Sequence, residues 1–436
     1  MRFYDREEEL VFLEKQEQRS RVTAQLTLVI GRRRIGKTSL LKKSIEGKKA
    51  LYFFVAKKSE SLLVEEFSEI IRTNLNISWY GELKSFKDIF GILMDHAVKD
   101  PFTLVIDEFQ EFLNINSTIF SDMQNIWDSK KEESKINLII CGSIYSMMKR
   151  IFEDAKEPLF SRATGKIRLQ PFGTKTIKEI LADHKPGYSP SDLFALFTLT
   201  GGVAKYLENM VNASAFNLDD MLDEIFQSNS LMVEEGKHVL IEEFGRDYST
   251  YFSILSLIAS SKTSRPEIES ILEMSIGGYL ERLENEFGII KKIKPILSKP
   301  SSRRIKYRIE DNFLNFWFRF IYKYRSIVEI ENFDLIKQIV KRDFSGYSGF
   351  VLEKYFYQKL KETKAYSKIG TYWEKGNQNE IDIVAVNEFE KKLMIAEVKL
   401  NKEKFNLPSL MKKSEHLLFK FQGFEIEYRC LSLEDL

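Results

Sequence analysis

Short apolar runs alternate with segments of helical period along the first part of the chain. The runs are Leu26–Ile30, Ala50–Val55, Thr103–Ile106, Asn137–Cys141 and Ile167–Leu169. Between them, as in Leu62–Asn74 and Phe86–Val98, apolar residues recur every three or four positions, which is the period of a half-buried helix. Strands that alternate with helices are typical of a parallel sheet. The pattern predicts an α/β domain over residues 1–170.

The rest of the chain divides into three sections with different patterns. Residues 171–235 have mainly helical periods and include GGVAKYLENM, which predicts a helical lid. Residues 236–330 contain three helical patterns, YSTYFSILSLIAS, PEIESIL and IGGYLERLENEFGII, followed by a basic hairpin, KKIKPILSKPSSRRIKYRI. This order predicts a winged helix-turn-helix. Residues 335–436 begin with a helix, continue with strands near Ile381–Val386 and Leu393–Val398, and end with a helix and a strand, which predicts a second α/β domain.

Length and composition favour a soluble protein of several domains. The 436 residues exceed the ~250–300 at which one core stops growing, and 43% hydrophobic with 30% charged residues is typical of globular proteins. The net charge is only +2, so a nucleic-acid partner would have to meet a local basic patch. Two cysteines and four histidines exclude a disulfide framework and a multi-cysteine zinc site. The N-terminus has no apolar signal segment and no run of ~18 apolar residues occurs, so we expect a cytoplasmic protein with no membrane partner.

The first apolar run leads directly into a phosphate-binding motif. The segment GRRRIGKTSLLKK matches G-x-x-x-x-G-K-[ST]. Its glycines allow backbone N–H groups to converge on phosphates, and the following helix presents its positive end. We expect Lys37 to reach the β- and γ-phosphates of ATP and the Thr38 hydroxyl to hold Mg²⁺. The predicted nucleotide-binding residues of the loop are Gly31, Arg32, Arg33, Arg34, Ile35, Gly36, Lys37, Thr38 and Ser39. The alternative, a chance glycine turn with a solvated lysine, is disfavoured by the strand before the motif and the helix after it.

The segment TLVIDEFQEF supplies the acids of the same site. Four apolar residues predict a buried strand, and Asp107 stands at its carboxyl end, where α/β sheets bind ligands. We expect Asp107 to hold Mg²⁺ through water, and Glu108 to orient and deprotonate the attacking water. Adjacent acids favour hydrolysis over nucleotide storage. The alternative is that both acids only begin the next helix.

Five segments together resemble the archaeal-type ATPases of the STAND branch of AAA+ proteins. They are FYDREEELVFL, GRRRIGKTSLL, LVIDEFQE, LIICGSIYSMM and TGGVAKYL, and they span roughly the first 230 residues. The resemblance implies that Ser143 senses the γ-phosphate, and that Arg162 completes a neighbour's site or its own, which would make a homo-oligomer a partner. The alternatives are that Ser143 caps the next helix and that Arg162 forms a surface salt bridge. Ala204 stands where the family usually has proline, which weakens the idea that Gly201–Tyr206 contacts the nucleotide.

The basic hairpin makes the predicted winged helix a candidate for contact with DNA or RNA. Its positive residues are Lys291, Lys292, Lys294, Lys299, Arg303, Arg304, Lys306 and Arg308. They could meet a phosphate backbone. The helix that should read bases offers Tyr279, Glu281, Arg282 and Glu284, in which acids offset the arginine. The alternative is a protein–protein module that locks the ATPase in one state, and the residues leave this choice open.

The last section contains carboxylates in strand-like positions. Side chains alternate along a strand, so Glu380 shares a face with Asp382, and Glu397 shares one with Lys399. Paired strands would gather Asp382, Glu397 and Lys399, where two carboxylates bind Mg²⁺ and the lysine orients or deprotonates water for phosphodiester cleavage. The arrangement resembles the PD-(D/E)xK nuclease superfamily, in which Glu353 matches the acid on the first helix. The alternatives are a silent binding platform and an ordinary half-exposed hairpin pair.

These interpretations combine into one hypothesis. The chain is expected to be an α/β P-loop NTPase, AAA+/STAND-like, with a helical lid, a winged helix and a C-terminal α/β nuclease-like domain. ATP and Mg²⁺ would drive a switch that licenses a Mg²⁺-dependent nuclease-like domain to act on nucleic acid. The second hypothesis is a nucleotide-sensing regulator or scaffold with a silent C-terminal domain. A chaperone-like ATPase is a third, against which the basic hairpin argues mildly.

Overall fold

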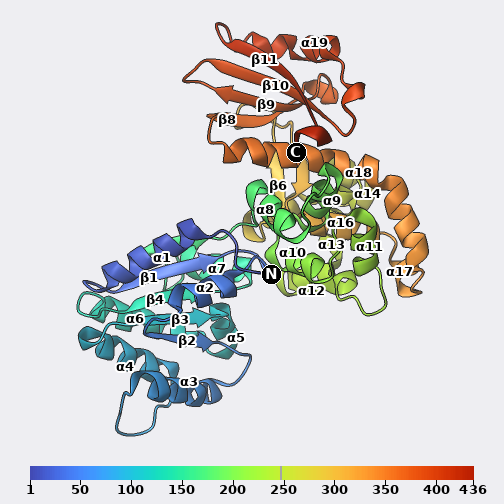
Figure 1. Ribbon diagram of the computed structural model, residues 1–436. Helices are drawn as coiled ribbons and strands as arrows, with labels where there is room; N and C mark the ends of the chain where they lie inside the picture. Colours follow the sequence, from blue (N-terminus) through green and yellow to red (C-terminus); the bar gives the residue numbers. More distant parts are fainter. Residues whose placement is uncertain (246–247) are drawn as a thin grey trace. The chain divides into compact units, whose positions relative to one another are not determined.

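The computed structural model describes residues 1–245 and 248–436 (Figure 1). By internal contacts the chain forms two compact units. One unit is residues 5–170, and the other is residues 171–436 together with residues 1–4.

The unit of residues 5–170 is built on a five-stranded parallel sheet, all of it within described residues. The strands are β1 (Gln25–Ile30), β2 (Ala50–Phe54), β3 (Thr103–Asp107), β4 (Asn137–Cys141) and β5 (Gly165–Arg168), in the order β2-β3-β4-β1-β5. The helices are α1 (Glu7–Ser20), α2 (Lys37–Ile45), α3 (Glu60–Leu75), α4 (Phe86–Lys99), α5 (Phe112–Ile115), α6 (Thr118–Lys130) and α7 (Tyr145–Glu153). Every residue of β1, β3 and β4 is buried, as expected for a parallel sheet covered on both faces. The predicted α/β sheet is therefore confirmed.

The first part of the other unit is mainly helical. Its helices before the hairpin are α8 (Thr174–His184), α9 (Pro190–Thr200), α10 (Ala204–Asn212), α11 (Leu218–Ile225), α12 (Met232–Phe244), α13 (Tyr248–Ala259), α14 (Arg265–Leu272) and α15 (Gly277–Glu281). Strands β6 (Ile290–Ile293) and β7 (Lys306–Ile309) then pair antiparallel. Gly201 ends α9 with a φ of +58°, a conformation that favours glycine, so the first glycine of TGGVAKYL has a structural reason to be there.

Helices and a mixed sheet complete this unit. The helices are α16 (Asn312–Phe316), α17 (Arg325–Glu329), α18 (Phe333–Glu362) and α19 (Leu407–Leu418). The strands are β8 (Lys368–Tyr372), β9 (Ile381–Asn387), β10 (Lys392–Lys399) and β11 (Glu425–Ser432), in the order β11-β10-β9-β8. Within this four-stranded sheet, β10 and β11 pair parallel and are joined by a crossover through α19, whereas the other two pairs are antiparallel. Strand β8 was not predicted, because KIGTY contains a glycine and no clear alternation.

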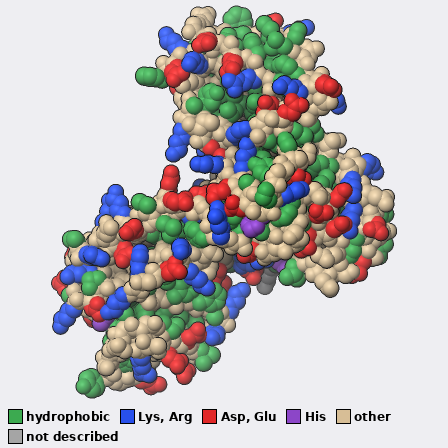
Figure 2. All heavy atoms as spheres, viewed as in Figure 1, with side chains coloured by type: hydrophobic (Ala, Val, Ile, Leu, Met, Phe, Trp, Pro, Cys, Tyr) green, Lys and Arg blue, Asp and Glu red, His purple; other side chains and the backbone are tan. Residues whose placement is uncertain are grey.

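The surface has no dominant sign of charge on the face shown in Figure 2, where acidic and basic side chains are interspersed over each unit. This agrees with the near-balanced composition of 66 basic and 64 acidic residues. None of the described helices is long and apolar enough to cross a membrane.

Candidate functional site

The loop between β1 and α2 has the backbone that the phosphate motif requires. Gly36 stands immediately before α2 with a φ of +94°, which L side chains rarely adopt. A Cβ atom on Gly31 would lie 2.3 Å from Ile35 Cδ1 and 2.8 Å from the Leu169 carbonyl oxygen. Both glycines of the motif are therefore required by geometry, at the point where the loop turns into the N-terminus of α2.

Lys37 lies almost buried inside this loop, with 7% of its surface exposed. Its Nζ donates hydrogen bonds to the carbonyl oxygens of Gly31 and Arg32, each 2.8 Å away. Burial lowers the pKa of Lys37, while the charges of Asp107 and Glu108 act in the opposite direction. The ammonium is thus held by neutral carbonyls, which a phosphate oxygen can replace as an acceptor with full negative charge.

Asp107 joins the loop to the end of β3. The Thr38 hydroxyl donates to Asp107 Oδ2 at 3.1 Å, so the two predicted magnesium-binding residues lie together. Asp107 Oδ1 accepts the backbone N–H of Glu108 at 2.9 Å, which orients the buried carboxylate. A third partner was missed from the sequence: the Tyr52 hydroxyl, from β2, donates to Oδ2 at 2.5 Å. Burial and the neighbouring Asp107 carboxylate raise the pKa of Tyr52. Nothing in the run ALYFF marked Tyr52 as different from its aromatic neighbours.

Glu108 sits in a turn with a φ of +55°, a conformation that costs a non-glycine residue free energy and is common at functional sites. The Ser143 hydroxyl donates to its Oε2 atom at 2.6 Å, and Gln110 Nε2 donates to the same oxygen. Ser143 does not cap the next helix, because the N-cap of α7 is Ile144 and no side chain caps it. The predicted water-activating acid and the predicted sensor therefore touch. Gln110, which the sequence analysis missed, completes this arrangement.

Arg162 forms the surface salt bridge that was the alternative to a role at the nucleotide. Its Nη2 and Nε lie 2.9 and 3.2 Å from Asp128 Oδ2. A third nitrogen, Nη1, donates to the Phe160 carbonyl oxygen at 2.9 Å. These contacts use three nitrogens of the guanidinium as hydrogen-bond donors to groups within residues 5–170.

The basic hairpin is less available to a phosphate backbone than the sequence indicated. Lys306 pairs with Glu380 at 2.8 Å, and Arg308 pairs with Glu353 at 3.0 Å. Lys292 is also paired, with Glu284 at 2.5 Å. These three cations are therefore already paired with carboxylates of the same unit, and contact of the hairpin with DNA or RNA stays a prediction.

The C-terminal carboxylates come together as the strand parity predicted. Strands β9 and β10 pair antiparallel with Ala396 opposite Ile383, so the register continues to Glu397 beside Asp382. Asp382 Oδ2 accepts the Val398 N–H at 2.8 Å. Burial raises the pKa of Asp382, and the nearby Glu397 charge adds to this effect, whereas the Val398 N–H and Lys399 lower it.

Glu353, on α18, belongs to the same charged group. Burial raises its pKa to about 7, against the Arg308 charge, and the charges of Asp382 and Glu380 raise it further. A carboxyl with such a pKa exchanges a proton near neutrality. The four predicted residues Glu353, Asp382, Glu397 and Lys399 are thus close enough to influence one another, although they come from three separate elements.

Each of these carboxylates also has a partner from the protein. Glu397 is 4% exposed, and Lys399 Nζ lies 3.5 Å from its Oε2. Lys413, on α19, forms a second ion pair with Glu397 and was missed from the sequence. Across residues 1–245 and 248–436, no group of three or more His, Cys, Asp or Glu side chains could hold a metal ion. Asp382 and Glu397 are the predicted metal pair, and a metal there would displace Lys413 or share Glu397 with it.

The strand, glycine loop and helix, with a buried lysine and an acid at the end of β3, define a P-loop ATPase. Residues 3–210 match the model of the "ATPase domain predominantly from Archaea", and residues 317–413 match "Archaea bacterial proteins of unknown function". The uncharacterized protein MJECL04 of Methanocaldococcus jannaschii is 30% identical over 407 residues, 91% of this chain and 87% of that protein. The chain therefore belongs to the same family as MJECL04.

A solved structure supports the fold. The Walker-type ATPase paby2304 of Pyrococcus abyssi aligns with a TM-score of 0.56 over 72% of this chain and 96% of that chain. Sequence identity is 18%, so the similarity concerns the fold alone.

Proposed function

We propose that the protein is an ATP-driven switch of the STAND type, in which Lys37, Thr38 and Asp107 bind the Mg²⁺-bound triphosphate. The observation that supports this most is the contact between Thr38 and Asp107, beside a lysine already buried in the phosphate loop. Mg²⁺, when bound, would neutralise charge on the β- and γ-phosphates. Thr38 and Asp107 fit this ion because a hydroxyl and a carboxylate already face each other. Tyr52 steadies the carboxylate.

Hydrolysis is assigned to Glu108, which would accept a proton from the attacking water. Ser143 and Gln110 both donate hydrogen bonds to the Glu108 carboxylate and hold it in a defined position. We propose that these two bonds control whether the carboxylate faces the attacking water. The test is single-turnover hydrolysis with nucleotide affinity measured in parallel. Glu108→Gln should bind ATP normally and hydrolyse it at least ~100-fold more slowly. Hydrolysis at the wild-type rate by this variant would remove Glu108 from the mechanism.

We further propose that the switch governs a Mg²⁺-dependent nuclease-like site made of Glu353, Asp382, Glu397 and Lys399. The pairing of β9 with β10 supports this proposal, since Asp382 and Glu397 are the next positions after the paired residues Ile383 and Ala396. In this site Lys399 would orient or deprotonate water, and the two acids would hold the metal. The test is nicking of plasmid, single strands and RNA with Mg²⁺ or Mn²⁺, comparing wild type with Asp382→Ala and Lys399→Ala.

A second function is favoured by the ion pairs around the same acids. Lys413 neutralises Glu397 and Arg308 neutralises Glu353, so the acids are balanced by protein cations. In this alternative the C-terminal domain is catalytically silent, and the protein is a nucleotide-sensing regulator or scaffold. The same nicking assay distinguishes the two functions. Cleavage that Asp382→Ala abolishes supports the nuclease, and absence of cleavage under every metal and nucleotide condition supports the regulator.

A further inference from the structure

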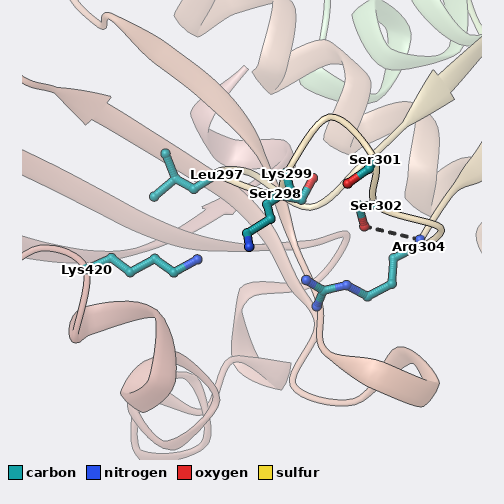
Figure 3. Close-up of a pocket in the computed structure, with 7 residues that line it drawn as sticks. All are labelled: Leu297, Ser298, Lys299, Ser301, Ser302, Arg304 and Lys420. Carbon is teal, nitrogen blue, oxygen red and sulfur yellow. Dashed lines mark hydrogen bonds between the residues drawn. The ribbon is translucent and has the colours of Figure 1, made fainter.

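A polar pocket opens where the β6–β7 hairpin loop meets the segment after α19, within the unit of residues 171–436. Its volume is about 360 Å³. The residues that line it are Leu297, Ser298, Lys299, Ser301, Ser302, Arg304 and Lys420 (Figure 3). In Figure 3, Lys420 and Arg304 extend toward each other from opposite sides, and Lys299 lies between them. Three positive side chains thus meet around one cavity, although Lys420 is more than 100 positions from the hairpin in sequence.

The positive charge of this pocket is not neutralised by the protein. No carboxylate is among the described residues that line it. Lys299 and Lys420 make no ion pair or side-chain hydrogen bond with any described part of the chain. Arg304 donates from Nη1 to the Trp373 carbonyl oxygen at 3.1 Å, an acceptor without a formal charge. Lys306 and Arg308, on the strand that follows the same loop, are by contrast both paired with glutamates.

The loop is held in a defined shape that presents hydroxyls to the same space. Ile296 N–H donates to the Thr371 carbonyl oxygen of β8 at 2.7 Å, which fixes the loop to the C-terminal sheet. Leu297 then adopts a φ of +61°, a conformation that costs free energy and needs the surroundings to hold it. Ser298, Ser301 and Ser302 bring hydroxyl groups to the pocket wall. Ammonium, guanidinium and hydroxyl donors are the groups that bind phosphate oxygens.

We propose that this pocket binds a phosphate group, and that its source is a nucleic-acid strand handled by the carboxylate site. A series of contacts links the pocket to the carboxylate site. Arg304 bonds Trp373, whose ring lies 4.7 Å from Lys306 Nζ, and Lys306 pairs with Glu380, two residues before Asp382. The pocket would anchor the backbone of the strand while the carboxylates act on it. The identity of the strand rests on the proposed function, whereas the affinity for phosphate rests on the pocket alone.

The test measures binding of labelled single-stranded DNA, duplex DNA and RNA by fluorescence anisotropy over a salt series. The pocket variant is Lys299→Ala/Lys420→Ala. Its matched control is Lys404→Ala/Lys412→Ala, which removes two exposed lysines from the same C-terminal part of the chain. We expect the pocket variant to weaken binding ~10-fold or more at low salt. The slope of log affinity against log salt should fall by about 1.4 for single strands and about 1.8 for duplex, while the control changes neither.

The outcomes separate this inference from the proposed function. If wild type and pocket variant bind nucleic acid with the same affinity and salt slope, the pocket assignment is wrong and the proposed function stands. If wild type binds no nucleic acid, the proposed action on nucleic acid fails. Titration with inorganic phosphate, followed by ³¹P NMR, then tests whether the pocket binds phosphate at all. Phosphate binding that only the pocket variant loses supports a site for free phosphate. Equal behaviour of the two proteins in that titration overturns the inference.

Discussion

Replacing Lys37 by alanine removes the ammonium that the structure holds in the phosphate loop. In the structure Nζ donates to two carbonyl oxygens at 2.8 Å. A phosphate oxygen that replaces these acceptors would attract the ammonium with a Coulomb energy of about 4 kcal/mol. This value assumes a separation of ~4 Å between the charges and an effective dielectric constant of ~20. Giving up the two hydrogen bonds to carbonyls offsets roughly 1–2 kcal/mol of this gain.

The net contribution is therefore about 2–3 kcal/mol, or an affinity for ATP that is ~30- to 150-fold weaker in Lys37→Ala. Calorimetry or a fluorescent ATP analogue, with Mg²⁺ present, measures this loss. Lys42→Ala is the matched control, because Lys42 is exposed on the same helix, α2. It should change the affinity less than about twofold.

The role of the Lys37 ammonium in binding ATP is refuted if folded Lys37→Ala binds ATP as tightly as wild type. It is also refuted if the control loses as much affinity, because the effect would then be a general one of charge. Reduced binding in Lys37→Ala alone is the result that the burial of this side chain requires.

Three further outcomes are expected. Glu108→Gln should retain ATP affinity but release phosphate at least ~100-fold more slowly in single turnovers; equal rates would contradict the role of the carboxylate. Asp382→Ala should abolish Mg²⁺-dependent nicking while Glu415→Ala, which removes an exposed acid on α19, leaves it intact; cleavage that survives Asp382→Ala refutes the site. Glu353 has a folded-state pKa of about 7 against the ordinary glutamate pKa of 4.5, so the native state binds more protons between these values. The free energy of unfolding should therefore fall as pH rises through that window, by up to ~3 kcal/mol, and denaturant titrations of Glu353→Gln should lack this decrease.

The phosphate loop could be predicted from the sequence because its geometry is local. Eight consecutive residues, Gly31 to Thr38, set the turn, the lysine and the hydroxyl, and the apolar run before them predicts a buried strand. The place of Asp107 in the site could be predicted for the same reason, since this residue ends the buried strand TLVID. Strand parity likewise predicted that Glu380 shares a face with Asp382 and that Glu397 shares one with Lys399, because side chains alternate with a period of two.

The partners of these residues could not be predicted. Tyr52 lies 55 positions from Asp107, and Arg308 lies 45 from Glu353. Lys413 is one of 66 basic residues, and only the packing of α19 selects it for Glu397. Strand β8 exists through its pairing with β9, which its own composition does not indicate.

The sequence by itself thus determined which residues are candidates for chemistry, because motif spacing and alternation are properties of adjacent positions. The tertiary structure decided which charges neutralise one another and which remain available. It paired Lys306 and Arg308 with glutamates and left Lys299 and Lys420 around a pocket. These choices depend on the distance between segments that are far apart in the chain, and that distance is set by topology and packing.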